Sequence, residues 1–179
     1  MLGELRTALN DATATVCLAG AGLRKLAETF AGFPTQVGNA DPQIHIGNGD
    51  PNQPESEVFA NWRVSELVNQ TVLNGPADTR LGHQWIVTFY AHWEEDIRPR
   101  LATAHGCGKD DIKLPLLGDL RWLRHCVVHR KGISRGFGEV LQWFGPGEGI
   151  SLRGEHYAEF HRKFPWDELR LAPGAHEGN

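Results

Sequence analysis

One row of large apolar residues constrains the fold of this chain more than any other feature. The row consists of Leu81, Trp85, Phe89, Trp93, Ile97 and Leu101. Each member follows the last by four residues, which places consecutive side chains about one turn apart along a ridge of an α-helix. Ile86 and Tyr90 broaden that face, so a helix over about residues 80–104 should pack against several neighbours. We interpret its aromatic side chains as core, and we expect Pro99 to kink its last turns.

A second helix is predicted over residues 114–132, with a narrower apolar stripe and a basic flank. The stripe consists of Leu116, Leu120, Leu123 and Val127. Beside it lie Arg121, Arg124, His125 and His129. The pair Lys131-Gly132 is typical of a helix end. Two arginines and two histidines are unusual in so apolar a helix, and they indicate that this helix binds an anionic group.

The rest of the chain predicts shorter helices around one long loop. Residues 2–32 form one helix or two short ones, and residues 34–56 form an irregular loop with a short strand at 43–46. We interpret that loop as mobile. Ser56 is expected to cap a helix over 57–73, and residues 157–164 mark a final short helix. The sequence therefore predicts an all-α bundle of four or five helices, a single domain over 1–171, and a flexible tail over 172–179.

Composition limits the partners and the compartment. The chain has 18 lysines and arginines against 22 aspartates and glutamates, so a polynucleotide has to meet a local basic patch. Its three cysteines are scattered and indicate no disulfide framework. No apolar run reaches signal-peptide or membrane-spanning form, so we expect a cytoplasmic protein without membrane contact.

Arg124 and His129 provide the residue types that metal-free RNA cleavage requires. A guanidinium binds phosphate oxygens, and an imidazole transfers protons near neutral pH. At 100° per residue the two side chains stand about 140° apart around a helix, so a two-fold dimer is expected to pool the residues of two chains. Arg100 and His105 share this spacing, but His105 falls in a glycine-rich turn.

The surrounding residues resemble a known family. The run DIKLPLLGDLRWLRHCVVHRKGI is similar to the signature helix of HEPN domains, which carry an Arg-x(4–6)-His motif. In that family Asn, Asp or His usually follows the arginine, and His125 satisfies this pattern. The flanks YAHWEEDIRPRLA and GEVLQWFGPGEGISL resemble one prokaryotic branch, so the likeness covers roughly residues 81–152.

The resemblance implies a helical homodimer that joins through its motif helices. It implies a metal-independent endoribonuclease, of toxin or antiviral type, that needs no metal or cofactor. Arg124 would hold the scissile phosphate, His129 would transfer protons and His125 would assist. Further phosphate contacts are expected from Arg121, Arg130 and Lys131, and Glu94 or Glu95 would orient the basic cleft.

A cognate antitoxin is a further expected partner. One toxin branch also has a nucleotidyltransferase partner that modifies a tyrosine two residues after the histidine. Here that position holds Lys131, which is a departure from the branch.

Three other interpretations stay open at the sequence level. Arg124 is also explained as a surface residue paired with Asp119, Glu94 or Glu95, and His129 as a histidine favoured by the helix dipole. His125 and His129, four residues apart, are also suited to bind zinc with Cys126, His83 or His92, although the general base of a zinc-protease helix is missing. Finally, HEPN-like domains also serve as non-catalytic nucleotide-binding, RNA-binding or assembly modules.

Overall fold

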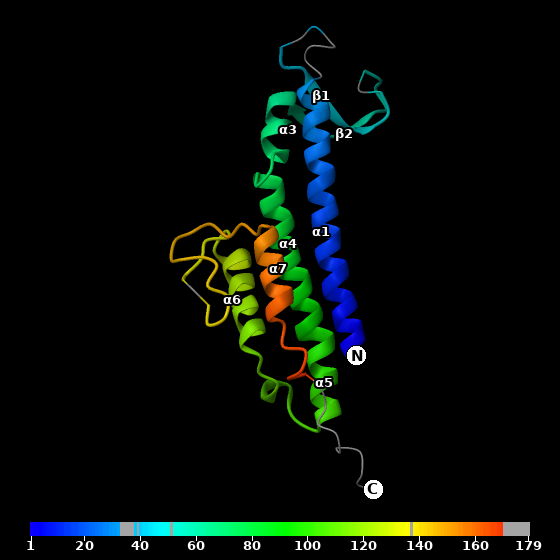
Figure 1. Cartoon of the computed structure of the whole chain (residues 1–179). Coiled ribbons are helices and arrows are strands. Elements are labelled where there is room, and N and C mark those ends of the chain that lie inside the picture. Colours follow the sequence, from blue (N-terminus) through cyan, green and yellow to red (C-terminus); the bar gives the residue numbers. More distant parts are fainter. Residues whose placement is uncertain (33–37, 39, 51, 137, 170–179) are drawn as a thin grey trace. The chain divides into compact units, whose positions relative to one another are not determined.

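The computed structural model describes residues 1–32, 38, 40–50, 52–136 and 138–169, and it is mostly helical (Figure 1). In chain order the elements are α1 (Leu2–Ala31), β1 (Gln43–Asn48), β2 (Glu57–Arg63), α3 (Val64–Thr71), α4 (Pro76–His92), a π-helical turn (Trp93–Ile97), α5 (Arg98–His105), a 3-10 turn (Lys109–Asp111), α6 (Pro115–His129) and α7 (Gly154–Lys163). The chain forms two compact units, Met1–Cys17 with Thr79–Asn179, and Leu18–Asp78. The single domain over 1–171 stays a prediction, and the tail 172–179 lies outside the described residues.

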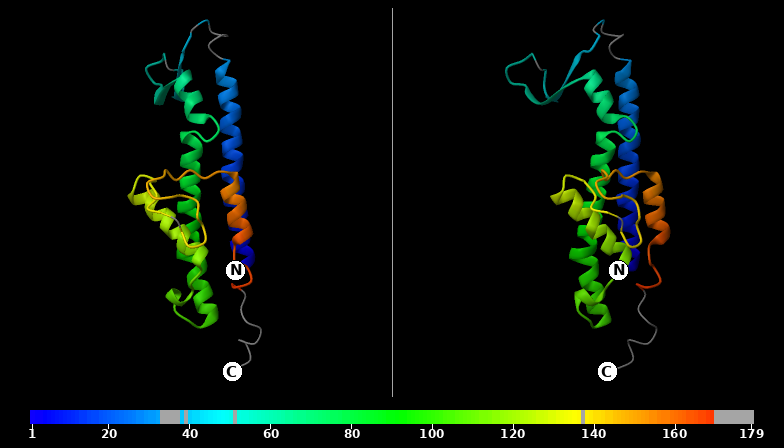
Figure 2. Two further views of the ribbon diagram at one scale, coloured as in Figure 1. Left: turned by 60° about the vertical axis from the view of Figure 1, so that its left-hand side comes forward. Right: turned by 90° about the vertical axis from the view of Figure 1, so that its left-hand side faces the viewer.

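The core of the first unit is built around Trp85 of α4. Its ring stacks on Phe89 at 5.6 Å and meets the edges of Tyr157 and Phe160 of α7 at 5.2 and 5.1 Å. Its indole N–H donates to Thr13 of α1 at 3.2 Å, so α4, α7 and the first half of α1 lie side by side (Figure 2). Trp85 is 1% exposed, and the aromatic row is core, as the spacing predicted.

The predicted helix over residues 80–104 is interrupted rather than continuous. Helix α4 ends at His92, and Trp93–Ile97 form a π-helical turn before α5 begins with Pro99 in its first turn. Proline has no N–H to donate to the carbonyl four residues earlier, which for Pro99 is that of Glu95 within the π-helical turn. The π-helical turn therefore lies directly before Pro99, in the region where a kink was predicted from the sequence.

Helix α6 matches the predicted basic helix closely. Pro115 occupies its first turn, and Lys131 and Gly132 follow its last residue with φ values of 55° and 76°. The Arg130 and Gly132 N–H groups donate to the Cys126 carbonyl at 2.9 and 3.1 Å. A Cβ on Gly132 would lie 2.6 Å from the His83 ring, so this helix end requires glycine.

The segment after α6 has no helix or strand among its described residues before α7, apart from a single bridge between Ile133 and Gly149. Asp119 of α6 holds this segment in place. Its buried carboxylate accepts the backbone N–H groups of Glu139, Val140 and Leu141 at 2.9, 2.6 and 2.8 Å. The contact fixes an irregular segment against the motif helix.

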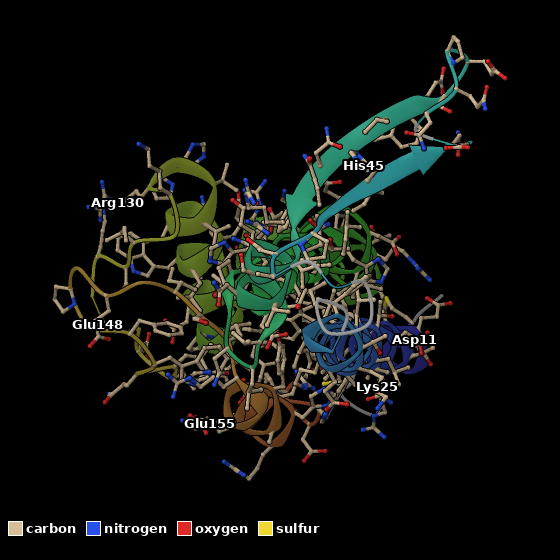
Figure 3. All side chains as sticks on the ribbon, turned by 90° about the horizontal axis from the view of Figure 1, so that it is seen from above. Asp11, Lys25, His45, Arg130, Glu148 and Glu155 are labelled. Carbon is tan, nitrogen blue, oxygen red and sulfur yellow. The ribbon has the colours of Figure 1, made fainter. Side chains whose placement is uncertain are left out.

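The second unit corrects the all-α prediction, because β1 and β2 pair as an antiparallel hairpin, on which Figure 3 labels His45. The short strand expected at 43–46 is confirmed and extends to Asn48. The helix expected over 57–73 is wrong in its first half, since Glu57–Arg63 is a strand and only Val64–Thr71 is helical. The β-branched and aromatic residues Val58, Phe59 and Trp62 favour extended backbone. Pairing with β1 supplies the hydrogen bonds that an extended segment needs.

Among the described residues, no helix combines the length and the apolar character that crossing a bilayer requires.

Candidate nucleic-acid interface

One side of α6 gathers three ring side chains. Trp122, His125 and His129 occupy positions i, i+3 and i+7, so they fall on one face of the helix. The Trp122 and His125 rings are stacked with centroids 6.2 Å apart and planes 16° apart, and the His125 and His129 centroids are 4.9 Å apart. The Arg135 guanidinium, from the segment after α6, lies 5.5 Å from the Trp122 ring. We call these four residues the imidazole face.

In the described part of the chain, the cations on and beside this face form no ion pair with a carboxylate. They are Arg121, Arg130, Lys131 and Arg135, and Arg124, on another side of the helix, also forms none. Figure 3 shows Arg130 at the outer side of the end of α6. The face is thus a local basic patch on a chain of net charge −4, which is the arrangement that binding of a polyanion requires.

The environment of His125 favours its neutral form. Burial lowers the pKa of His125, and the nearby positive charges of His129, Arg135 and Arg130 lower it further. A neutral imidazole has a free nitrogen lone pair. His125 is therefore the histidine of the pair that is suited to accept a proton at neutral pH.

Arg124 lies apart from the two histidines. Its guanidinium carbon is 5.9 Å from the centre of the Tyr90 ring on α4, and its Nε is buried without a hydrogen-bond partner. In the described part of the chain it makes no hydrogen bond, ion pair or ring contact with His125 or His129. The structure thus brings the two histidines together and leaves the motif arginine on another side of the same helix, as the 140° separation predicted.

The carboxylates proposed as partners of Arg124 are engaged elsewhere. Asp119 binds the three backbone N–H groups described above. Glu94 accepts hydrogen bonds from Arg98 at 2.8 Å and the Tyr90 hydroxyl at 3.2 Å, and Lys109 lies 2.8 Å from its other oxygen. Burial pushes the pKa of Glu94 upward, but the hydrogen bonds from Lys109 and Arg98 outweigh it and hold that pKa below its ordinary value.

The expected orienting role of the two glutamates stays a prediction. Glu94 touches Tyr90, on whose ring Arg124 lies. Glu95 is exposed, and among the described residues it has no hydrogen bond or ion pair. Of the two carboxylates, only Glu94 is placed to act on the basic helix.

Two cavities adjoin α6. One of about 550 Å³ lies between its first turns and the π-helical turn, and another of about 370 Å³ is lined by Trp122, His125 and Arg135. Both cavities share Gly118 and Arg121 as lining residues. They therefore adjoin one another along the helix.

The described residues contain no group of three or more histidine, cysteine or carboxylate side chains that could hold a metal ion. The ligands considered for zinc lie in other contacts. The His83 Nε2 is 2.7 Å from the Ile150 carbonyl, His92 lies beside Asp96, and Cys126 is fully buried. His125 and His129 thus stand as a pair without a third ligand in this part of the chain.

Two members of the imidazole face, Trp122 and Arg135, are not among the site residues predicted from the sequence. Trp122 lies one helical turn before His125, so helical spacing alone would have placed it on the face. Arg135 gave no such signal, because its position depends on the irregular segment that Asp119 holds.

No protein-family model, curated protein or solved structure matches this chain. The fold and the site define it as a mostly helical protein with a basic, aromatic and imidazole-bearing helix face.

Proposed function

We propose that this chain is a HEPN-like, metal-independent endoribonuclease of toxin or phage-defence type that cleaves RNA along α6. One observation carries the proposal: two imidazoles, with ring centroids 4.9 Å apart, lie on a helix face beside cations that form no ion pair among the described residues. The sequence motifs in residues 81–152 that resemble those of HEPN domains also support this proposal.

The proposed reaction is an internal transesterification of RNA. His125, as a neutral imidazole, accepts the proton of the 2′-hydroxyl, and the 2′-oxygen forms a bond to the adjacent phosphorus. The bond from phosphorus to the 5′-oxygen breaks, and that oxygen takes a proton from His129. The products are a 2′,3′-cyclic phosphate and a 5′-hydroxyl, so the step consumes neither water nor metal.

The surrounding residues would bind the substrate. Arg121, Arg130, Lys131 and Arg135 would contact phosphates, and their charge would stabilise the oxygens of the transition state. Trp122 offers a ring on which a base can stack.

A homodimer through α6 would bring Arg124 into use. Val128 of α6 and Ile133 of the segment that follows it are large apolar residues with exposed fractions of 49% and 39%. In such a dimer Arg124 of one chain would serve the histidines of the other. An antitoxin that covers this face stays a prediction.

The test is cleavage of varied RNAs by the purified protein in excess EDTA. His129→Ala, His125→Ala and Arg124→Ala should each reduce the rate by roughly 100-fold or more, as expected for loss of proton transfer or of phosphate stabilisation. The matched control is His105→Ala, which removes the histidine of the second pair and should leave the rate unchanged. Loss of activity in EDTA would contradict the metal-free mechanism.

The second candidate is an RNA-binding module without catalysis. The position of Arg124 on Tyr90 favours it, because a single chain then presents two histidines without the motif arginine. Under this alternative the wild type binds RNA without cutting it, and His129→Ala binds nearly as well.

A further inference from the structure

The larger cavity beside α6 combines an aromatic wall with two kinds of charge at its rim. We call it the α6 pocket. Its apolar lining includes Tyr90, Trp93 and Leu117, which are 7%, 2% and 3% exposed, and Arg121 and Glu139 are among its polar lining residues. Its volume of about 550 Å³ falls within the usual range of small-molecule sites.

The position of Glu139 is fixed by the fold. Its backbone N–H donates to the Asp119 carboxylate at 2.9 Å, and the next two residues bind the same carboxylate. The Glu139 side chain is exposed, and in the described part of the chain it forms no ion pair. An unpaired carboxylate at the rim of an aromatic pocket accepts hydrogen bonds and donates none.

Arg121 connects this pocket to the imidazole face. It lines both cavities, and Gly118, which both also share, precedes His125 by seven residues, or about 10 Å along the helix. A single RNA strand bound along α6 would place a base in the pocket, and the 2′-hydroxyl and 3′-phosphate of the same nucleotide between Arg121 and His125.

We propose that the α6 pocket is a base-binding subsite that selects guanine next to the cleaved phosphate. The inference rests on the proposed function, since it assigns a sequence preference to the same RNA-cleaving face. Guanine presents two neighbouring N–H donors on its Watson–Crick edge, and these match the carboxylate of Glu139. The other bases lack that pair of donors, so the carboxylate distinguishes guanine from them.

The test is binding of the four ribonucleoside 3′-monophosphates to the full chain by calorimetry. Guanosine 3′-monophosphate should bind roughly ten-fold or more tightly than the other three, because a wrong base leaves the carboxylate unpaired. Glu139→Gln should remove that preference while the fold is kept, and Arg121→Ala should weaken all four nucleotides alike. Glu155→Gln, at an exposed position of α7, is the matched control.

The outcomes separate the subsite from the nuclease. Guanine-selective binding that depends on Glu139 would support the subsite even if no RNA is cut, in which case the proposed catalysis alone fails. Equal binding of all four nucleotides, or an unchanged preference in Glu139→Gln, would overturn the subsite. Cleavage of RNA without any preference at the neighbouring base would overturn it as well and would leave the nuclease intact.

Discussion

At the scale of the residue, the site depends on how its cations act on His125. Removal of Arg135 takes away one of the positive charges that disfavour the protonated imidazole. We therefore expect Arg135→Ala to raise the pKa of His125 toward its ordinary value. NMR titration of the free protein measures this directly.

The same substitution should move the acid side of the pH–rate profile to higher pH. A neutral base becomes protonated, and cleavage is lost, as the pH falls through the pKa of that base. If the pKa of His125 is raised, this loss occurs at a higher pH. Arg162→Ala, an exposed arginine of α7, should shift neither curve. An unchanged titration in Arg135→Ala would show that Arg135 does not govern the charge of His125.

Lys131 shows a residue kept in a costly conformation. Its φ of 55° is left-handed, a region in which a residue with a Cβ pays about 1 kcal/mol or more relative to glycine. Lys131→Gly should therefore raise the free energy of unfolding by about 1 kcal/mol and still weaken RNA binding, because it removes a phosphate contact.

Lys131→Ala separates the two effects. It also removes the charge but keeps the Cβ, so it should weaken RNA binding equally without the gain in stability. Denaturant unfolding and binding at two salt concentrations measure both. Unaltered RNA affinity in the two variants would remove Lys131 from the proposed interface.

At the scale of the element, Asp119 joins α6 to the segment that supplies Arg135 and Glu139. Asp119→Ala leaves three backbone N–H groups without their acceptor, and we expect a loss of about 3 kcal/mol in the free energy of unfolding. Amide exchange at residues 139–141 should accelerate. Gly138→Ala should act similarly, because a Cβ there would lie 2.5 Å from the Asp119 carboxylate.

Asp11→Ala, an exposed position of α1, is the control for this pair. A melting temperature for Asp119→Ala equal to that of the control would show that the carboxylate does not hold the segment. If Asp119→Ala loses the guanine preference and shows faster amide exchange, the contact between Asp119 and residues 139–141 is needed to form the α6 pocket.

The elements also show what local sequence can predict. The helices with clear apolar periodicity, α4 and α6, follow from spacing alone, and so does the approach of His125 to His129. Strand β2 does not, because Glu57–Arg63 becomes extended through pairing with β1, a partner that the pattern of residues 57–73 alone does not reveal. The position of Arg135 and the α6 pocket depend in the same way on the Asp119 contact, which no local pattern encodes.

At the scale of the whole molecule, the decisive question is whether one chain or two make the site. Arg124 and His129 lie apart around α6, so a site that needs both is incomplete within one chain if Arg124 stays on Tyr90. Arg124→Ala and His129→Ala should each be inactive alone. When the two variants are mixed and allowed to exchange subunits, one site of each mixed dimer regains an intact arginine and an intact histidine, so activity should return in part.

Val128→Glu tests the same interface from the other side. A buried charge at the centre of a two-fold contact is costly, so this variant should be monomeric by analytical ultracentrifugation and should not complement either partner. Leu73→Glu adds the same charge at another exposed apolar position, 65% exposed, and should change neither property. A monomeric wild type that cleaves RNA would contradict the shared site, and Arg124 would then have to leave Tyr90 to act within its own chain.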